Sequence, residues 1–290
     1  MRDYILMTDS CCDLTAQMAE ELDLAVLPLS LTMGEDTYRN WLDGREIGFK
    51  AFYDRVRQGS MPTTSAISVG DFEEAMRNAL DAGKDILCIN FSSALSATYQ
   101  SAVIAADNLR EEYPDAKIYT VDSHAASLGQ GLLLYLCAKK KAEGLPIDAL
   151  RDFTEERKQQ VCHWFTVDDL NHLKRGGRVS AAAALFGTML AIKPVLHVDD
   201  EGRLVPVSKA RGRKASLLAL VDEMEKTAID PGRQTIFISH GDCEDDVNFV
   251  ADEIRRRFGT KEIHINYVGP VIGSHTGAGV VALFFLGSKR

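Results

Sequence analysis

The sequence predicts an α/β protein of two domains, and three observations support this prediction. The length of 290 residues suits two domains of about 100–200 residues each. In the first half, short apolar runs alternate with helical patterns, which indicates a parallel sheet with helical crossovers. In the second half, apolar runs flank the turn Asp199–Gly202, which indicates an antiparallel hairpin. We expect an N-terminal three-layer α/β/α domain over residues 1–160 and a C-terminal two-layer α/β domain with a mixed six-stranded sheet over residues 161–290.

Four apolar runs in the N-terminal half predict the strands of the parallel sheet. They are Tyr4–Met7, Leu24–Leu31, Asp85–Phe91 and Lys117–Val121. Pro28 lacks a backbone donor and therefore favours an edge position for the second run. Apolar residues at helical spacing predict helices near residues 14–22, 49–58, 69–80, 100–112, 128–136 and 145–160. Ser68 and Asp71 form a capping-box pattern at the start of the third helix.

Six apolar runs in the C-terminal half predict the strands of the mixed sheet. They are Val161–Val167, Ile192–Val198, Arg203–Ser208, Gln234–Ser239, Glu262–Val268 and Val280–Leu286. Helical patterns lie at 181–190, where alanine dominates, at 215–224, and in the stretch that ends near Phe258.

Composition argues against several classes of partner. Hydrophobic residues make up 46% and charged residues 26% of the chain, as in ordinary globular proteins. The formal net charge of −9 argues against a general surface for nucleic acid. The apolar run before Thr8 is too short for a secretory signal, and no run approaches the roughly 18 residues of a spanning helix. We therefore expect a cytoplasmic protein.

The six cysteines indicate neither a disulfide framework nor a metal site. They are Cys11, Cys12, Cys88, Cys137, Cys162 and Cys243. Apart from the first pair they are scattered, and none shows the spacing of metal-binding cysteine pairs. We expect small buried side chains in a reducing compartment, with no metal ion and no cofactor.

The stretch Gly269–Gly279 is a predicted loop between two predicted strands and combines four glycines with a single histidine, His275. Glycine lets a backbone approach a ligand closely because it has no Cβ atom. Two interpretations stay open. The stretch is either a tight turn with a histidine by chance or a ligand site in which His275 is accessible.

Hydroxyl side chains gather where several predicted strands end. These strand ends are Thr8–Ser10, Ser92–Ser96 and Asp122–Ser123, and the loop at Thr64 and Ser65 is similar in composition. Ligands of parallel sheets bind beyond the carboxyl ends of the strands. The hydroxyl groups therefore predict either a site lined with neutral donors or a set of helix caps.

The stretch from Lys174 to Lys214 is basic. Its 41 residues hold nine basic and three acidic side chains, a net charge of +6. For most of them a solvated surface is the simpler interpretation. Arg178, Arg211 and Arg213 differ because they lie beside glycines, where a guanidinium is well suited to bind a carboxylate or phosphate.

Together these motifs resemble the DegV family of bacterial fatty-acid-binding proteins. The matching segments, in chain order, are Thr8–Ser10, Thr64–Ser68, Ser96–Gln100, Leu173–Arg178, Ile192–Pro194, Lys209–Lys214 and Gly269–Gly279. Each match is short, but seven in the right order along almost the whole chain form a specific signal.

The resemblance implies a long-chain fatty acid in a buried tunnel, with its carboxylate near the domain interface. Thr64, Ser96 and His275 match the residues that contact this carboxylate in the family. Their neighbours in the head-group loops are Ser65 and Thr276. The family's arginines that serve the acyl-phosphate or kinase docking correspond to Arg178 and Arg211.

The resemblance also implies a carrier and not an enzyme. Such a carrier presents its fatty acid to a separate fatty-acid kinase, which forms an acyl-phosphate, a precursor of phospholipids. It implies no insertion into the membrane and allows transient membrane contact. Burying a carboxylate requires donors. On this interpretation Thr64 and Ser96 each donate a hydroxyl hydrogen, and a protonated His275 or an arginine compensates the charge.

Three departures from the family pattern leave the acyl-chain preference open. They are Ala66-Ile67 in place of Gln-Pro, Ala97 in place of Gly, and Ala278 in place of Pro. All three keep the hydrogen-bonding groups of the motifs.

Two other functions are compatible with the same residues. One is a phosphoryl- or acyl-transfer enzyme that uses His275 as nucleophile or general base. The other is an anion-binding regulator that uses the basic stretch. The carrier is favoured because the chain lacks a phosphate-binding loop of the Walker type and a kinase signature.

Overall fold

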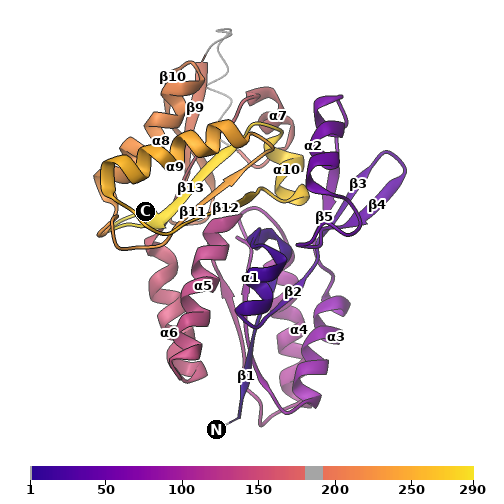
Figure 1. The fold of residues 1–290 in the computed structure, drawn as a ribbon. Coiled ribbons are helices and arrows are strands. Elements are labelled where there is room, and N and C mark those ends of the chain that lie inside the picture. Colours follow the sequence, from indigo (N-terminus) through magenta and orange to yellow (C-terminus); the bar gives the residue numbers. More distant parts are fainter. Residues whose placement is uncertain (1, 180–191) are drawn as a thin grey trace.

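The computed structural model describes residues 2–179 and 192–290. Two sheets stand one above the other, and the helices of each half pack around them (Figure 1). This arrangement confirms the predicted α/β architecture with a parallel N-terminal sheet and a mixed C-terminal sheet. The predicted alanine-rich helix at 181–190 lies outside the described residues. The boundary near residue 160 stays a prediction.

The N-terminal sheet contains four parallel strands in the order β2-β1-β6-β7. They are β1 (Tyr4–Asp9), β2 (Leu24–Leu27), β6 (Asp85–Asn90) and β7 (Ile118–Asp122). Every residue of β6 is buried, as expected for a central parallel strand whose two faces are both covered. The edge position of β2 is the one that Pro28 predicted.

Helices cover both faces of this sheet, which gives the predicted three layers (Figure 1). On one side lie α3 (Val69–Asp81) and α4 (Thr98–Glu112), and on the other α5 (Leu128–Ala142) and α6 (Ile147–Arg157). The shorter elements are η1 (Ser10–Cys12), α1 (Ala16–Glu21) and η2 (Lys158–Gln160). The Ser68 hydroxyl caps α3 by accepting the backbone N–H of Asp71 at 3.1 Å, so the predicted capping residue is confirmed.

A small third sheet is absent from the sequence prediction. It is antiparallel, in the order β4-β3-β5. Its strands are β3 (Ser30–Met33), β4 (Asp36–Arg39) and β5 (Thr63–Ser65), and α2 (Phe49–Arg57) lies between β4 and β5 in the chain. The single strand predicted over Leu24–Leu31 is therefore wrong. It is two strands that belong to different sheets, separated at Pro28 and Leu29.

The C-terminal sheet has the predicted six strands, in the order β10-β9-β8-β13-β11-β12. They are β8 (Val161–Thr166), β9 (Ile192–Val198), β10 (Leu204–Arg211), β11 (Ile236–His240), β12 (Ile263–Tyr267) and β13 (Val281–Leu286). Within the described residues, β11 and β12 pair in parallel and the other neighbouring strands of this sheet pair antiparallel. The helices α8 (Arg213–Thr227) and α9 (Glu244–Phe258) pack on this sheet, and so does α5 from the N-terminal half.

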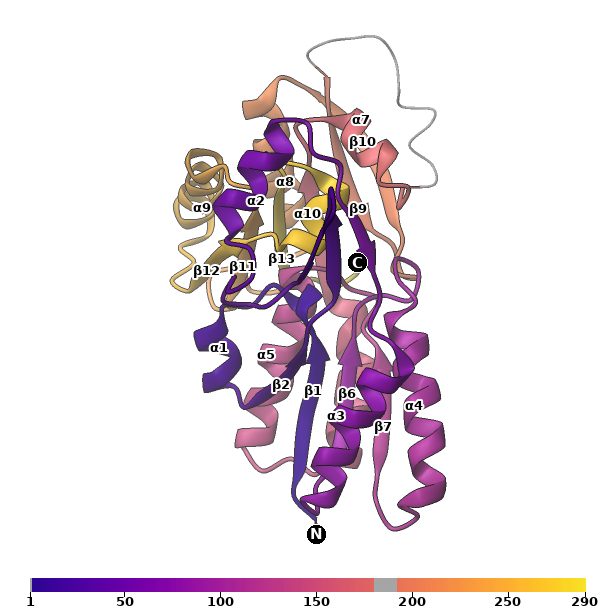
Figure 2. The same cartoon turned by 90° about the vertical axis from the view of Figure 1, so that its right-hand side faces the viewer.

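The glycine-rich stretch forms a short helix and not a loop. This helix is α10 (Pro270–Thr276), which begins with proline at a position where a missing N–H costs nothing. Gly277, with a φ of +78°, ends it. α10 packs against α2, α7 (Leu170–Arg175), β3 and β5, so the small sheet lies beside it (Figure 2). His275 is thereby brought next to residues more than two hundred positions earlier in the chain.

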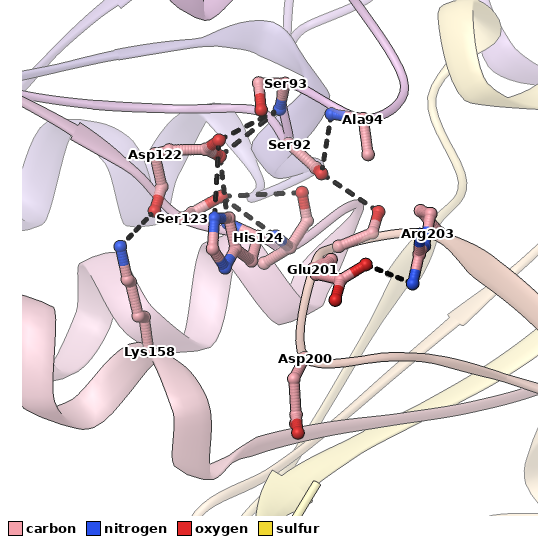
Figure 3. A network of polar contacts seen from close by, with 12 residues as sticks. Ser92, Ser93, Ala94, Asp122, Ser123, His124, Lys158, Asp200, Glu201 and Arg203 are labelled. Carbon is pink, nitrogen blue, oxygen red and sulfur yellow. Dashed lines mark hydrogen bonds and ion pairs between the residues drawn. The ribbon is translucent and has the colours of Figure 1, made fainter.

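The β9–β10 hairpin reaches across to the N-terminal half through its turn (Figure 3). The Ser92 hydroxyl donates to the Gly202 carbonyl at 2.9 Å, and the Gln159 side chain donates to the Asp200 carbonyl at 3.1 Å. Gly202 has a φ of +77°, and a Cβ atom there would lie 2.2 Å from the Ser92 hydroxyl oxygen. Only glycine therefore fits this contact between the two halves.

Candidate functional site

An apolar cavity of about 250 Å³ lies between the two large sheets. Residues from both halves of the chain line it. Its apolar walls consist of Leu29, Ala66, Phe91, Leu95, Ala97, Ala126, Phe165, Val198, Leu204, Val268, Val271, Ile272, Val280, Ala282 and Phe284. Val198 and Leu204 come from the β9–β10 hairpin, so the Ser92–Gly202 contact also fixes one wall of the cavity.

Six of the seven residues predicted for the site line this cavity. They are Thr64, Ser65, Ser96, Arg178, His275 and Thr276. The seventh, Arg211, is exposed at the end of β10 and is not among the lining residues. The Thr276 hydroxyl is already used, because it donates to the Ile272 carbonyl of its own helix at 3.2 Å.

Thr64 and His275 form the central polar contact of the cavity. The Thr64 hydroxyl oxygen lies 2.8 Å from Nε2 of His275. Nδ1 of the same ring lies 3.0 Å from the Gly176 carbonyl oxygen. Burial, and after it the charge of Arg178, lowers the pKa of His275 to about 4, although the Gly176 carbonyl opposes this shift. The imidazole is therefore neutral at pH 7.

Gly176 is a residue of this site that sequence reasoning missed. A Cβ atom on Gly176 would lie 2.8 Å from the backbone oxygen of His275 and 2.9 Å from its Cα atom. Glycine thus allows the two backbones to approach until the Gly176 carbonyl meets the imidazole. The adjacent pair Gly176-Gly177 before Arg178 is the sequence signal for this close approach.

Ser96 precedes α4 and shares its hydroxyl with Thr98. The backbone N–H of Thr98 donates to the Ser96 hydroxyl oxygen at 3.2 Å, and the two hydroxyl oxygens lie 2.9 Å apart. The position and partners of Ser96 follow from this turn at the helix start. Ala97, one of the family departures, lines the cavity next to it.

Arg178 lines the cavity but remains exposed. Its guanidinium donates to the Gly176 carbonyl at 3.0 Å, the same oxygen that faces His275. Arg178 can therefore act on a ligand head group through a solvent-screened charge and through its remaining guanidinium N–H groups.

Most of the predicted hydroxyl-rich strand ends do not reach the cavity. The Thr8 hydroxyl donates to the Ile89 carbonyl at 2.7 Å, and the Ser10 hydroxyl accepts the Leu29 N–H at 3.0 Å. Asp9 accepts the Phe91 N–H at 2.8 Å, and Asp122 accepts the Ser93 N–H at 3.2 Å (Figure 3). These groups tie strand ends to loops, so of the predicted strand ends only Ser92–Ser96 contributes a hydroxyl to the cavity lining that the structure describes.

Two buried polar residues of the cavity wall had no sequence signal. His163 on β8 lies 3.0 Å from the Val161 carbonyl through Nδ1, and burial holds its pKa well below the usual value. The Ser127 hydroxyl donates to Asp13 at 2.6 Å and lies 2.9 Å from the Ser239 hydroxyl. Burial raises the pKa of Asp13 to about 7, against the hydrogen bond from Ser127. This network joins the N-terminal half to β11.

Several basic side chains of the stretch Lys174–Lys214 form ion pairs. Lys193 pairs with Asp168, and Arg203 pairs with Asp199 and Glu201. Arg213 pairs with Asp246 at 2.8 Å and borders a charged depression of about 630 Å³. This depression also holds Arg57, which pairs with Asp242, so its charges largely neutralise one another. The pairing does not favour an anion-binding regulator.

Within residues 2–179 and 192–290, we find no cluster of three metal-ligating side chains. No helix in the same ranges has the length and apolar character needed to span a membrane.

Comparison with known proteins assigns the chain to a family. A family model described as "Uncharacterised protein, DegV family" matches residues 4–288. The chain belongs to the DegV family. A DegV domain-containing protein of Clostridium perfringens is 47% identical over 290 residues, which cover 100% of this chain and 99% of the relative.

Solved DegV structures share the fold along their whole length. One is the DegV family protein of Thermus thermophilus, described by its fatty-acid binding, with a TM-score of 0.87, 33% identity and coverage of 98% of this chain and 99% of that chain. Another is DegV of Bacillus subtilis, described as a fatty-acid-binding protein, with a TM-score of 0.82, 30% identity and the same coverage. Structural neighbours of this chain therefore bind fatty acids.

Proposed function

We propose that this chain binds a long-chain fatty acid, with the tail in the cavity and the carboxyl group at Thr64, Ser96 and His275. The observation behind this proposal is a cavity with apolar walls whose central polar contact is the Thr64–His275 pair. Burying a methylene group stabilises a complex by about 0.8 kcal/mol, so the tail dominates affinity and the polar residues orient the head group. The fatty-acid binding described for the Thermus thermophilus and Bacillus subtilis proteins supports the proposal.

Native mass spectrometry tests this proposal. We expect the purified protein to carry an acyl adduct, or, after delipidation, to take up one added fatty acid per chain. Ala282→Leu is the matched disruption, because Ala282 on β13 lines the cavity and a larger side chain would fill it. Ala219→Leu on α8 is the control outside the cavity. A delipidated wild-type chain that takes up no fatty acid would refute the proposal.

The finer part of the proposal is delivery to a separate fatty-acid kinase in the cytoplasm. Two features support it. The chain has no phosphate-binding loop of the Walker type, and the exposed arginines Arg178 and Arg211 are available for a partner or a phosphate. Incubation with ATP and fatty acid should form acyl-phosphate, trapped as a hydroxamate, only when a bacterial fatty-acid kinase is added. Formation by the chain alone would contradict the carrier role.

A second candidate function is acyl transfer by the chain itself. One observation favours it: a hydroxyl, a neutral imidazole and a carbonyl that orients the ring stand in line at Thr64, His275 and Gly176. This is the arrangement of a nucleophile, a general base and its orienting group. The chain should then hydrolyse p-nitrophenyl acyl esters, with loss of turnover in Thr64→Val. The carrier proposal expects no turnover above background.

A further inference from the structure

The direction of the Thr64–His275 hydrogen bond decides what the head-group site can accept. A carbonyl oxygen can only accept a hydrogen bond, so Nδ1 of His275 must carry the hydrogen that faces Gly176. In a neutral imidazole, Nε2 is then the acceptor. The hydroxyl of Thr64, 2.8 Å away, must therefore donate its only hydrogen to Nε2. What Thr64 offers to a ligand is a lone pair.

The surroundings of His275 keep the ring neutral. The groups that act on it are Arg178 and His172, both on the α7 side of the site, and together with burial they lower its pKa to about 4. Strands β3 and β5 contain no titratable residue within Ser30–Met33 and Thr63–Ser65.

The remaining neighbour of α10 is helix α2, whose ionisable side chains are engaged elsewhere. Tyr53 donates its hydroxyl to the Val268 carbonyl at 2.7 Å. Lys50 pairs with Asp54, Arg57 with Asp242, and Arg55 donates to the Tyr38 hydroxyl. Helix α2 therefore supplies no carboxylate that would stabilise a protonated His275.

Ser96 has the opposite polarity to Thr64. Its oxygen accepts the backbone N–H of Thr98 and lies 2.9 Å from the Thr98 hydroxyl, which can donate to it. Either hydroxyl can donate in this contact, and because Thr98 is fully buried whereas Ser96 lines the cavity, we take Thr98 as the donor. The Ser96 hydrogen is then free for a ligand. The cavity thus presents one donor, Ser96, and one acceptor, Thr64. A neutral carboxyl group, with one acceptor oxygen and one O–H, matches this pair, whereas a carboxylate presents two acceptors.

We infer that the site binds a fatty acid together with one proton, which is shared between the ligand carboxyl group and Nε2 of His275 through the Thr64 hydroxyl. This inference rests on the proposed function. The balance is simple: a fatty-acid anion and one proton from solvent enter, and no covalent bond to the protein forms. If the proton lies on the ligand, Thr64 accepts from the acid. If it lies on Nε2, Thr64 accepts from His275 and donates to the carboxylate.

The inference predicts the class of head group that the site prefers. A primary fatty amide has one carbonyl acceptor and N–H donors, so it mimics the neutral acid and should bind without uptake of a proton. A permanently anionic alkyl sulfonate of equal chain length cannot bring the proton, so it should bind more weakly than the acid at pH 7.

Titration calorimetry in buffers of different ionisation enthalpy measures the proton count directly. Between pH 6.5 and 8.5 we expect uptake of about one proton per palmitate, and a Kd that rises about tenfold per pH unit, because the free acid is ionised throughout this range. The fatty amide should show neither effect. Saturable palmitate binding without proton uptake would overturn the inference and leave the proposed function intact. Failure of palmitate and amide to bind at all would overturn both.

His275→Gln separates the role of the imidazole from simple loss of structure. The glutamine amide can donate to Thr64, which frees the Thr64 hydrogen for a carboxylate. We expect weaker palmitate binding with proton uptake near zero, so the proton count, and not the affinity, is the readout. His264→Gln is the matched control and should keep full uptake, because His264 is a half-buried histidine on β12 that does not line the cavity. If His275→Gln does not fold, the number of protons taken up by the wild type still decides whether the inference holds. Arg178→Ala should leave the count unchanged, and a lost dependence on pH in that variant would contradict the inference.

Discussion

The hydroxyl oxygen of Thr64 and Nε2 of His275 lie 2.8 Å apart, although 211 positions separate them in the chain. Thr64 belongs to β5 of the small sheet, and His275 belongs to the last turn of α10. The contact exists because α10 packs against β5 and β3. It connects the N-terminal and C-terminal halves at the wall of the apolar cavity.

Thr64→Val should weaken fatty-acid binding about two- to tenfold with little loss of stability. Valine keeps the shape of threonine but removes the hydroxyl group, and a hydrogen bond of this kind contributes about 0.5–1.5 kcal/mol. Fluorescence or calorimetric titration of a delipidated sample measures the change. Thr63→Val is the matched control, because Thr63 is the exposed neighbour on the same strand and does not line the cavity. Equal effects of the two substitutions would contradict a role for Thr64 at the head group.

Gly176→Ala should disturb His275 and cost about 1–3 kcal/mol of unfolding free energy. The new methyl group would meet the backbone of His275 at 2.8 Å, so the two segments must separate. The hydrogen bond to Nδ1 should weaken, and the ¹⁵N shifts of the imidazole should report mixed tautomers. Gly70→Ala at the start of α3 is the control, since its Cβ would meet nothing nearer than 3.9 Å. Unchanged imidazole shifts in Gly176→Ala would contradict the role given to this carbonyl.

The sequence predicted the large sheets well because their strands are continuous apolar runs that end in clear turn signals. β6 and β13 are examples, with every residue or nearly every residue buried. It missed β3, β4 and β5, which have only three or four residues each and partly exposed side chains. It also took α10 for a loop, because glycine disfavours helices and only packing against α2 and α7 compensates for that preference.

The candidate site was predictable only in part. Short motifs located Thr64, Ser96 and His275, all of which line one cavity. The same motifs could not reveal that Gly176 fixes the imidazole, because that contact joins residues 99 positions apart. The motifs also did not distinguish Thr8 and Ser10 from Ser96, because the sequence does not show whether a hydroxyl at a strand end faces a ligand or a neighbouring backbone.

Ser92→Ala should loosen the β9–β10 hairpin from the N-terminal half. The substitution leaves the Gly202 carbonyl and the Ala94 N–H without their hydroxyl partner. Buried groups left unpaired cost about 1–3 kcal/mol, which urea denaturation should detect. Hydrogen exchange should rise in β9 and β10, and fatty acid should dissociate faster because Val198 and Leu204 line the cavity. Ser93→Ala, at the exposed neighbouring position, is the control and should change neither stability, hydrogen exchange nor dissociation of the fatty acid. If hydrogen exchange in β9 and β10 is as slow in Ser92→Ala as in Ser93→Ala, the Ser92–Gly202 contact does not fix the hairpin.

Asp13 should make the folded state less stable as the pH rises from about 4 to 7. Burial raises its pKa to about 7 in the folded state, whereas an unfolded aspartate titrates near pH ~3.9. Between these values the folded chain holds a proton that the unfolded chain has lost, so this contribution is fully present below pH ~4 and is lost as the pH rises through about 7. His275 acts in the opposite direction, because its folded pKa is lowered to about 4.

The pH dependence of the wild-type unfolding free energy is therefore not diagnostic by itself, and the variant Asp13→Asn is needed. The free energy of unfolding of wild type minus that of Asp13→Asn should fall by roughly 1 kcal/mol per pH unit across this window in urea denaturation. A difference that stays constant from pH 4 to 7 would mean that Asp13 is ionised in the folded protein despite its burial.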